Sequence, residues 1–234
     1  MISSLNLLIL VLCQLFELSG VGKVSRRGRV RDKWRSKRWF TVVAPEYFGS
    51  VEIGSVVADD PQKLIGRTVE STLYDVTEDF AHQYMKMYFQ IIDVEGKRAL
   101  TTFKGHEYAR DYLRSLVRRR TTRIDCIVDV MTKDGYKLRV SAVAFTLTRI
   151  KTSQEKEIRA VMKRVIEEKA ASLNFNQFVQ EAVLGKIASD IYNEAKKIVP
   201  LRHVGIRKSR LLSRPAIEAE RGLAVAVEEI SQTG

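Results

Sequence analysis

The hydrophobic residues between positions 39 and 150 are spaced mainly as in β-strands. Short apolar runs predict strands at residues 40–43, 51–57, 64–76 (one strand or two), 85–94 and 97–103, and Glu95-Gly96 suits a two-residue turn between the last pair. A second hairpin joins residues 123–132 to 136–149 through Lys133-Asp134-Gly135. Its second arm begins with alternating apolar and polar residues and ends apolar on both faces, which is typical of a strand entering a packed core.

A helix is predicted between the two hairpins, at residues 106–119. One face is apolar, and Arg110, Arg114 and Arg118 follow one another at i, i+4 and i+8 on another face. A helix with one core face and a stripe of arginines can lay cations along a phosphate backbone.

After residue 150 the hydrophobic period becomes helical. Thr152-x-x-Glu155 is a capping-box pattern that opens a first helix, and Asn174-x-x-Gln177 opens a second one that Gly185 ends or interrupts. A third helix is expected at residues 189–198, before Pro200, and residues 200–212 are expected to be a basic extended or loop segment.

These elements predict an α+β fold, with an antiparallel β-barrel-like body that carries one inserted helix and is followed by C-terminal helices. We expect five segments along the chain: residues 1–23, an apolar leader or a misplaced start; 24–38, a basic N-terminal arm; 39–150, a β-rich RNA-binding body; 151–212, a helical region with a basic segment; and 213–234, a mobile tail.

The apolar run of the leader, residues 5–16, is shorter than the roughly 20 residues that a helix needs to span a bilayer. No basic residue precedes it, unlike the start of a secretory signal. Three interpretations remain open: upstream sequence translated ahead of a true start at Val21 or Val24, a buried or interfacial helix, and a targeting segment.

The basic charge is concentrated in three clusters, residues 23–39, 110–123 and 196–214. They hold more than half of the 40 Lys and Arg residues but, of the 28 acidic residues, only Asp32 and Asp111. The net charge of +12 is therefore carried by the clusters, while the rest of the chain is acidic. This sorting favours binding to a polyanion, either a nucleic acid or an anionic membrane surface.

The first cluster also holds the only two tryptophans of the chain. An indole ring can stack on an unpaired base while the neighbouring cations contact phosphates. Trp34 is a candidate for such stacking, whereas Trp39 enters a predicted strand and is expected to anchor the segment in the core.

No motif for catalysis is present in the sequence. His82, His106 and His203 are isolated, and neither a zinc-ligand spacing nor a phosphate-binding loop occurs. We interpret Asp59-Asp60-Pro61 as a turn and the pair Asp125 and Asp129 as the solvent-facing side of a strand. We therefore expect no enzyme, no catalytic residue, no metal and no cofactor; Cys13 and Cys126, one of them in the leader, fit a reducing compartment.

A set of motifs spread over residues 26–212 resembles the archaeal and eukaryotic small-ribosomal-subunit protein family S-three-a-e, called e-S-one in the unified naming, in its archaeal branch. They are Asp32-Lys33-Trp34 with Lys37-Arg38-Trp39, Ala44-Pro45-Glu46-x-Phe48-Gly49, Ala58-Asp59-Asp60-Pro61, Leu64-Ile65-Gly66-Arg67, Gly105-His106-Glu107, the run from Arg110 to Arg119, Arg123-Ile124-Asp125, Asp134-Gly135-Tyr136, Thr152-Ser153, Val183-Leu184-Gly185-Lys186-Ile187, Pro200-Leu201-Arg202 and Ile206-Arg207-Lys208-Ser209.

The resemblance implies a cytoplasmic structural constituent of the small ribosomal subunit that supports translation. Its implied partners are small-subunit ribosomal RNA, neighbouring small-subunit proteins and mRNA near the exit channel. The alternative is a membrane-associated basic protein anchored by the apolar leader. The candidate RNA-binding residues are Arg26, Arg27, Arg29, Arg31, Lys33, Trp34, Arg35, Lys37, Arg38, Arg110, Arg114, Arg118, Arg119, Arg120, Arg123, Arg202, Arg207, Lys208 and Arg210.

Overall fold

The computed structural model describes residues 34–215. The chain divides into two compact units, Met1–Lys37 and Arg38–Gly234, and of the first unit only residues 34–37 are described. These four residues form a turn in which the Lys37 N–H donates to the Trp34 carbonyl, and the Lys37 Nζ lies 4.1 Å from the centroid of the Trp34 ring. The predictions made for residues 1–33 and 216–234 lie outside the described residues, including those for the leader, most of the arm and most of the tail.

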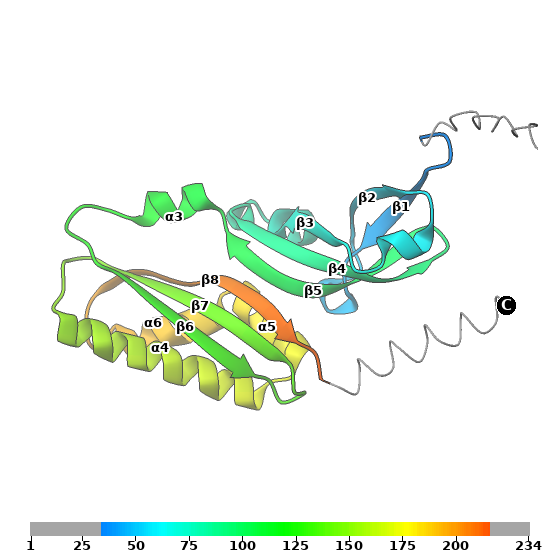
Figure 1. Cartoon of the computed structure of the whole chain (residues 1–234). Coiled ribbons are helices and arrows are strands. Elements are labelled where there is room, and N and C mark those ends of the chain that lie inside the picture. The colour runs from blue at the N-terminus through cyan, green and yellow to red at the C-terminus, as the bar shows by residue number, and fades with distance from the viewer. Residues whose placement is uncertain (1–33, 216–234) are drawn as a thin grey trace, which may run out of the picture. The chain divides into compact units, whose positions relative to one another are not determined.

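The second unit contains eight strands and a set of helices (Figure 1). In chain order the elements are β1 (Arg38–Val43), η1 (Glu46–Phe48), β2 (Glu52–Ala58), η2 (Pro61–Leu64), β3 (Thr68–Thr72), α2 (Leu73–Thr77), η3 (Phe80–His82), β4 (Met85–Glu95), β5 (Arg98–Tyr108), α3 (Arg110–Leu116), β6 (Arg123–Met131), β7 (Lys137–Thr146), α4 (Thr152–Ser172), α5 (Phe175–Val183), α6 (Lys186–Ala195) and β8 (Leu201–Ser213).

All eight strands belong to one sheet, in the order β2-β1-β5-β8-β7-β6, while β4 pairs with β5 and β3 pairs with β4. Every strand pair is antiparallel except β1 with β5, which is parallel. The predicted α+β class is confirmed. Because the sheet of the described residues does not close on itself, the term barrel-like holds only loosely.

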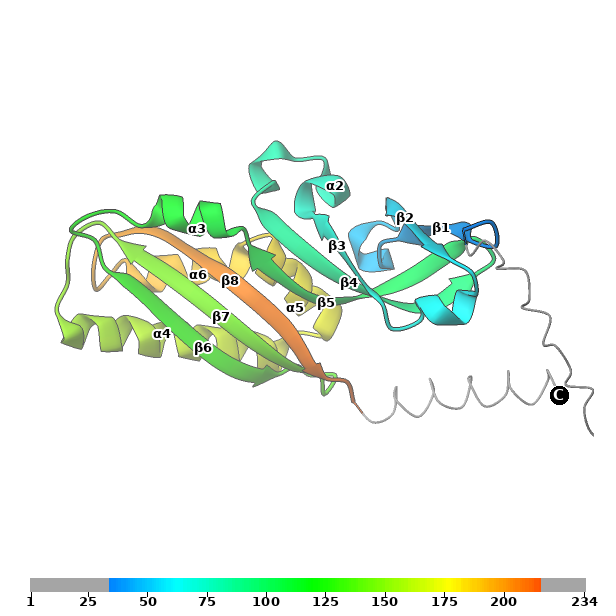
Figure 2. The same ribbon diagram turned by 45° about the horizontal axis from the view of Figure 1, so that its top comes forward.

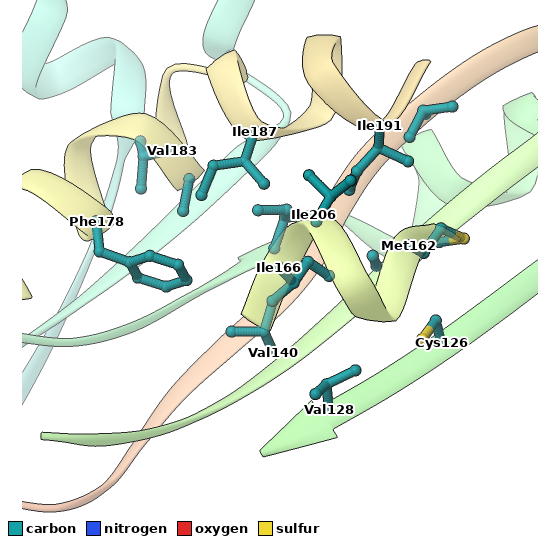
Figure 3. Close-up of a cluster of buried hydrophobic side chains, with 14 of the residues drawn as sticks. Cys126, Val128, Val140, Met162, Ile166, Phe178, Val183, Ile187, Ile191 and Ile206 are labelled. Atoms are coloured by element: carbon teal, nitrogen blue, oxygen red, sulfur yellow. The ribbon is translucent and has the colours of Figure 1, made fainter. Parts of the chain in front are cut away.

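Helices α4, α5 and α6 cover one face of the sheet, and α3 lies on the other side (Figures 1 and 2). The main core lies between these three helices and the strands. Figure 3 shows Met162 and Ile166 of α4 with Phe178, Val183, Ile187 and Ile191 of α5 and α6, over Cys126, Val128, Val140 and Ile206 of the strands. Each of these ten residues is at least 94% buried. Burial of this apolar surface holds the helices to the sheet.

The third basic cluster takes the extended form of its prediction: residues 201–213 form β8 in the middle of the sheet, between β5 and β7, a pairing that was not predicted. Leu201, Val204 and Ile206 are buried in the main core, whereas the basic residues of the strand, Arg202, Arg207, Lys208 and Arg210, are exposed or half-buried. The segment that follows the helices therefore returns to the sheet that residues 38–146 form.

Two other predicted elements have different bounds in the structure. Residues 64–76 form η2, β3 and the short helix α2, whose N-terminus is capped by Thr72 and Asp75. The predicted helix at 106–119 begins only at Arg110, because residues 106–108 continue β5, and it ends at Leu116, so Arg118 lies beyond it.

Trp39 is also corrected, since 65% of its surface is exposed. Side chains alternate along β1, and Phe40 and Val42 occupy a second, smaller core. Trp39 therefore points away from that core.

The predicted hairpin of β6 and β7 and the three C-terminal helices are confirmed. The first of these helices starts at Thr152 with Lys151 as its N-cap, and the Gln154 side chain, one residue before the expected Glu155, accepts from the Lys151 N–H. Asp59-Asp60-Pro61 leads into η2, as expected of a turn. No helix within residues 34–215 is long and apolar enough to cross a bilayer.

Candidate nucleic-acid interface

The face of the sheet opposite α4, α5 and α6, which we call the open face, is crossed by two rows of paired residues. One row runs through Ile127, Ser141, Lys208, Glu107 and Lys86, from β6 to β4. The other runs through Asp129, Arg139, Arg210, Gly105, Tyr88 and Glu70, from β6 to β3. Residues paired across strands share a face, so these polar side chains gather on one surface.

The acidic groups of the open face are matched by basic partners within it. Arg139 Nε donates to Asp129 Oδ1 at 2.7 Å, Lys208 Nζ to Glu107 Oε2 at 2.9 Å, and Lys86 Nζ to Glu70 Oε1 at 2.6 Å. The hydrogen bond from Arg139 lowers the pKa of the Asp129 carboxyl, and the bond to Glu70 raises the pKa of Lys86. These acids are therefore neutralised internally and repel an approaching anion only weakly.

Four cations of the same region have no such match. Arg210, Lys104, Arg110 and Arg114 make no salt bridge with another residue of the range 34–215. Arg210 is also paired across the strands with Arg139, and like charges placed opposite each other destabilise a sheet. Arg139 is compensated by Asp129, whereas Arg210 is not, so an anion bound here would relieve the repulsion.

Two hollows connect these cations. The first, of about 260 Å³, is lined by Lys104, Lys208 and Arg210, and the second, of about 460 Å³, by Lys86, Arg110 and Arg114. Both hollows share Tyr88 and Glu107 in their walls, so they are neighbours on one surface. The arrangement joins residues from β4, β5, β8 and α3.

Helix α3 is held in place by aromatic packing. The ring of Tyr112 stacks on that of Tyr84, with centroids 3.8 Å apart, and meets the His203 ring of β8 edge-on at 6.1 Å. Arg202 Nη1 donates to the carbonyl of Leu116 at 3.3 Å. Through these contacts the structure brings the second and third basic clusters together.

The other predicted residues of these two clusters lie around this surface. Arg118, Arg119 and Arg120 are exposed in the connection after α3, and Arg120 lines a shallow hollow with Arg149. Arg123 is bound to Asp125 at 2.9 Å, and Arg207 Nη1 lies 4.0 Å from the same carboxylate.

The first cluster is only partly described. Arg26, Arg27, Arg29, Arg31 and Lys33 lie outside the described residues. Trp34 and Arg35 are exposed, and one face of the Trp34 ring carries the Lys37 ammonium group. Arg38 is exposed at the start of β1, beside the exposed ring of Trp39.

Sequence reasoning missed Lys86, Lys104 and Arg139, which lie outside the charge clusters or on the predicted hairpin. The available signal was alternation, because Lys86, Tyr88 and Gln90 occupy alternate positions of β4 between buried residues. Alternation shows that these side chains face one side of the sheet, but it does not show which cations that side collects.

The helix-covered side differs in its electrostatics. Lys163 pairs with Glu167, Arg164 with Glu194 and Lys169 with Asp190, so cations and anions alternate along α4 and α6. Within residues 34–215 no group of His, Cys, Asp and Glu side chains could hold a metal ion. The paired charges of α4 and α6 attract phosphates less than Arg110, Arg114 and Arg210, which have no such partner.

Comparison with known proteins identifies the family to which the chain is similar. The model of a family described as the ribosomal S3Ae family matches residues 25–215. The small ribosomal subunit protein eS1 of Archaeoglobus fulgidus is 55% identical over 203 residues, which cover 86% of this chain and 96% of that protein. The proteins of the same name from Desulfurococcus amylolyticus and Sulfurisphaera tokodaii are 51% and 48% identical, covering 85% and 82% of this chain and 93% and 100% of their own lengths.

Proposed function

The chain belongs to the ribosomal S3Ae family, and from that premise we propose that it holds small-subunit ribosomal RNA against the open face of its sheet and α3. It is a structural constituent of the small ribosomal subunit, not an enzyme, and its place is the ribosome in the cytoplasm. The membrane-anchored alternative is not favoured, because relatives of ribosomal name cover most of the chain.

The observation that carries the proposal is the unmatched charge of Arg210, Arg110 and Arg114 on a surface where Asp129, Glu107 and Glu70 are already paired. Phosphate groups are the anions that such a surface would meet in the subunit, and arginine binds them through its planar fork of donors. Contacts of this kind fix the position of an RNA backbone and carry little sequence information. We extend the proposed contacts to Arg118, Arg119 and Arg120, to Arg123, Arg202, Arg207 and Lys208, and to the basic N-terminal arm.

Neighbouring ribosomal proteins and mRNA complete the proposed set of partners. The helix-covered side, with its paired charges, suits protein neighbours better than RNA. We also propose that the chain contacts mRNA near the exit channel. Photo-cross-linking of a bound mRNA in assembled subunits tests this contact. A cross-link to this chain supports it, and cross-links confined to other proteins contradict it.

The retention of the protein on small subunits tests the RNA-binding role. Replacing Arg110, Arg114 and Arg210 together by Ala removes the unmatched charge without touching the core, since all three side chains are exposed. The variant should dissociate from subunits at a lower salt concentration than the wild type, because each lost phosphate contact weakens binding. Sedimentation of particles washed with increasing salt measures this.

The matched control replaces Lys151, Lys156 and Lys163, which are exposed on or beside α4, by Ala. It removes the same charge from the helix-covered side and should dissociate like the wild type. Equal retention of both triple variants at every salt concentration would show that the open face does not hold RNA.

A further inference from the structure

A separate cavity of about 290 Å³ lies beside the first residues of β8. Strand β5 pairs with β8 only through Gly105, His106 and Glu107, so the stretch of β8 from Leu201 to Ile206 has no described strand on that edge. The cavity is found at this edge, between the tyrosines that support α3 and the first turns of α6. It shares no residue with the two hollows of the open face other than Tyr108, which lines the larger one.

The wall of the cavity is rich in flat rings. Tyr84, Tyr108 and Tyr192 line it together with His82 and His203. The Tyr84 ring is fixed by its stack on Tyr112 and by an edge-on contact with Tyr108 at 5.2 Å. Rings held in this way can receive another flat group without first losing much conformational freedom.

Two ring nitrogens in this wall lack partners. His203 Nε2 and His82 Nδ1 are shielded from water and make no hydrogen bond with any described residue. Burial, and then the charge of Arg202, lower the pKa of His203, so its imidazole is neutral at neutral pH. A neutral imidazole has one donor and one acceptor, so a ligand that offers both kinds of group could satisfy it.

A cation marks the mouth of the cavity. Arg202 is exposed and lines the cavity, and the hydrogen bond from its Nη1 to the Leu116 carbonyl fixes its position next to α3. The guanidinium group has five N–H donors, so this single bond leaves others for an anion. Arg202 thereby places a cation between the cavity and α3, whose arginines we propose to contact RNA.

We propose that this cavity receives one unpaired base of the small-subunit ribosomal RNA, which stacks on a tyrosine ring while Arg202 contacts its phosphate. Stacking on aromatic rings, polar groups for the base edge and an arginine for the phosphate are the means by which proteins hold unpaired nucleotides. This inference rests on the proposed function and deepens it. The open face contacts the phosphate backbone of the RNA, and the cavity binds one unpaired base.

Ultraviolet cross-linking of the protein to purified small-subunit ribosomal RNA, followed by mass spectrometry, tests the inference. A nucleotide should be attached to a peptide that contains Tyr84, Tyr192 or His203. Ser189→Phe fills the cavity from α6, and the exposed Asn193→Phe on the same helix is the matched control because Asn193 does not line the cavity. Ser189→Phe should abolish the cross-link and weaken RNA binding about tenfold, whereas Asn193→Phe should change neither.

Thermal unfolding checks that each variant folds. If Ser189→Phe does not fold, Tyr192→Leu, which removes a ring from the wall at similar size, replaces it and should give the same loss. The inference is overturned if the wild-type protein binds the RNA but gives no cross-link at the cavity, and if both Phe variants bind the RNA equally well. That result leaves the proposed function intact. Cross-links from the cavity only to another protein in assembled subunits also overturn it, whereas wild-type protein that does not bind the RNA contradicts the proposed function itself.

Discussion

His106 is completely buried in the sheet, and each of its ring nitrogens has a partner. Nε2 lies 3.1 Å from the Ile206 carbonyl, which can only accept, so Nε2 carries the proton and Nδ1 accepts from the Ser209 hydroxyl at 2.6 Å. Burial lowers the pKa of His106 to about 4. The two hydrogen bonds tie β5 to β8, and both are made by the neutral ring.

The stability of the protein should therefore fall as the pH falls below the value at which an unfolded histidine titrates. Above about pH 6.5 His106 is neutral in both states; between about 6.5 and 4 only the unfolded chain binds the proton, so folding loses stability. We expect a loss of about 2 kcal/mol between pH 7.5 and pH 5 from this residue.

Urea unfolding at these two pH values measures the loss. His106→Gln should unfold more easily at pH 7.5 but with a smaller difference between the two pH values than the wild type. Asn193→Gln, which changes an exposed side chain that does not titrate, should keep the wild-type difference. An unchanged difference in His106→Gln would contradict this role of His106.

Single residues also show what the sequence could and could not predict about the site. The clustered arginines were visible as charge, because clustering needs no knowledge of the fold. The matching of Glu107 by Lys208 depends on the pairing of β5 with β8, which brings together residues far apart in the chain. The exposure of Trp39 was predicted wrongly because apolar character alone does not reveal which face of β1 the ring takes.

At the scale of elements, the sequence predicted an extended or loop segment where β8 lies, but not its pairing with β5 and β7. Helices α4, α5 and α6 separate β8 from its partners β5 and β7 in the chain. The pairing of β8 with β7 is also irregular at three places. Irregular pairing breaks the alternation that identifies a strand in a sequence. The hairpin of β6 and β7 was predicted because its partners are neighbours in the chain and its turn residues are distinctive.

At Gly105 the backbone of β8 lies close to that of β5. A Cβ atom there would collide with the backbone carbonyl of Ser209, so only glycine lets the two strands pair. Gly105→Ala should lower the free energy of unfolding by roughly 1–3 kcal/mol, because β8 must shift. Gly54→Ala is the control: it is also in a strand, but nothing lies within 4 Å of its added Cβ.

Chemical denaturation of the two glycine variants measures this effect. Gly54→Ala should be neutral or slightly stabilising, since alanine restricts the unfolded chain. If Gly105→Ala were as stable as Gly54→Ala, the close approach of β5 and β8 would be wrong, and with it the cross-strand rows that define the open face.

At the scale of the whole molecule, the basic residues behind the net charge of +12 are clustered in the sequence, and the fold distributes basic and acidic side chains unevenly over the surface. Basic and acidic side chains alternate on the outer surfaces of α4 and α6, whereas the open face pairs its acids and leaves Arg210, Arg110 and Arg114 unmatched. The sequence predicted an anionic partner from the clusters. It did not predict that residues of α3 and β8 would share one surface, because no partner strand was predicted for the extended or loop segment at residues 200–212.

The salt dependence of binding to purified small-subunit ribosomal RNA tests this account most directly. In a plot of the logarithm of the binding constant against the logarithm of salt concentration, each lost phosphate contact reduces the slope by roughly 0.7–0.9. We predict that replacing Arg110, Arg114 and Arg210 by Ala reduces the slope by about two, while replacing Lys151, Lys156 and Lys163 leaves it unchanged. Equal slopes for the two triple variants would contradict the assignment of RNA binding to the open face.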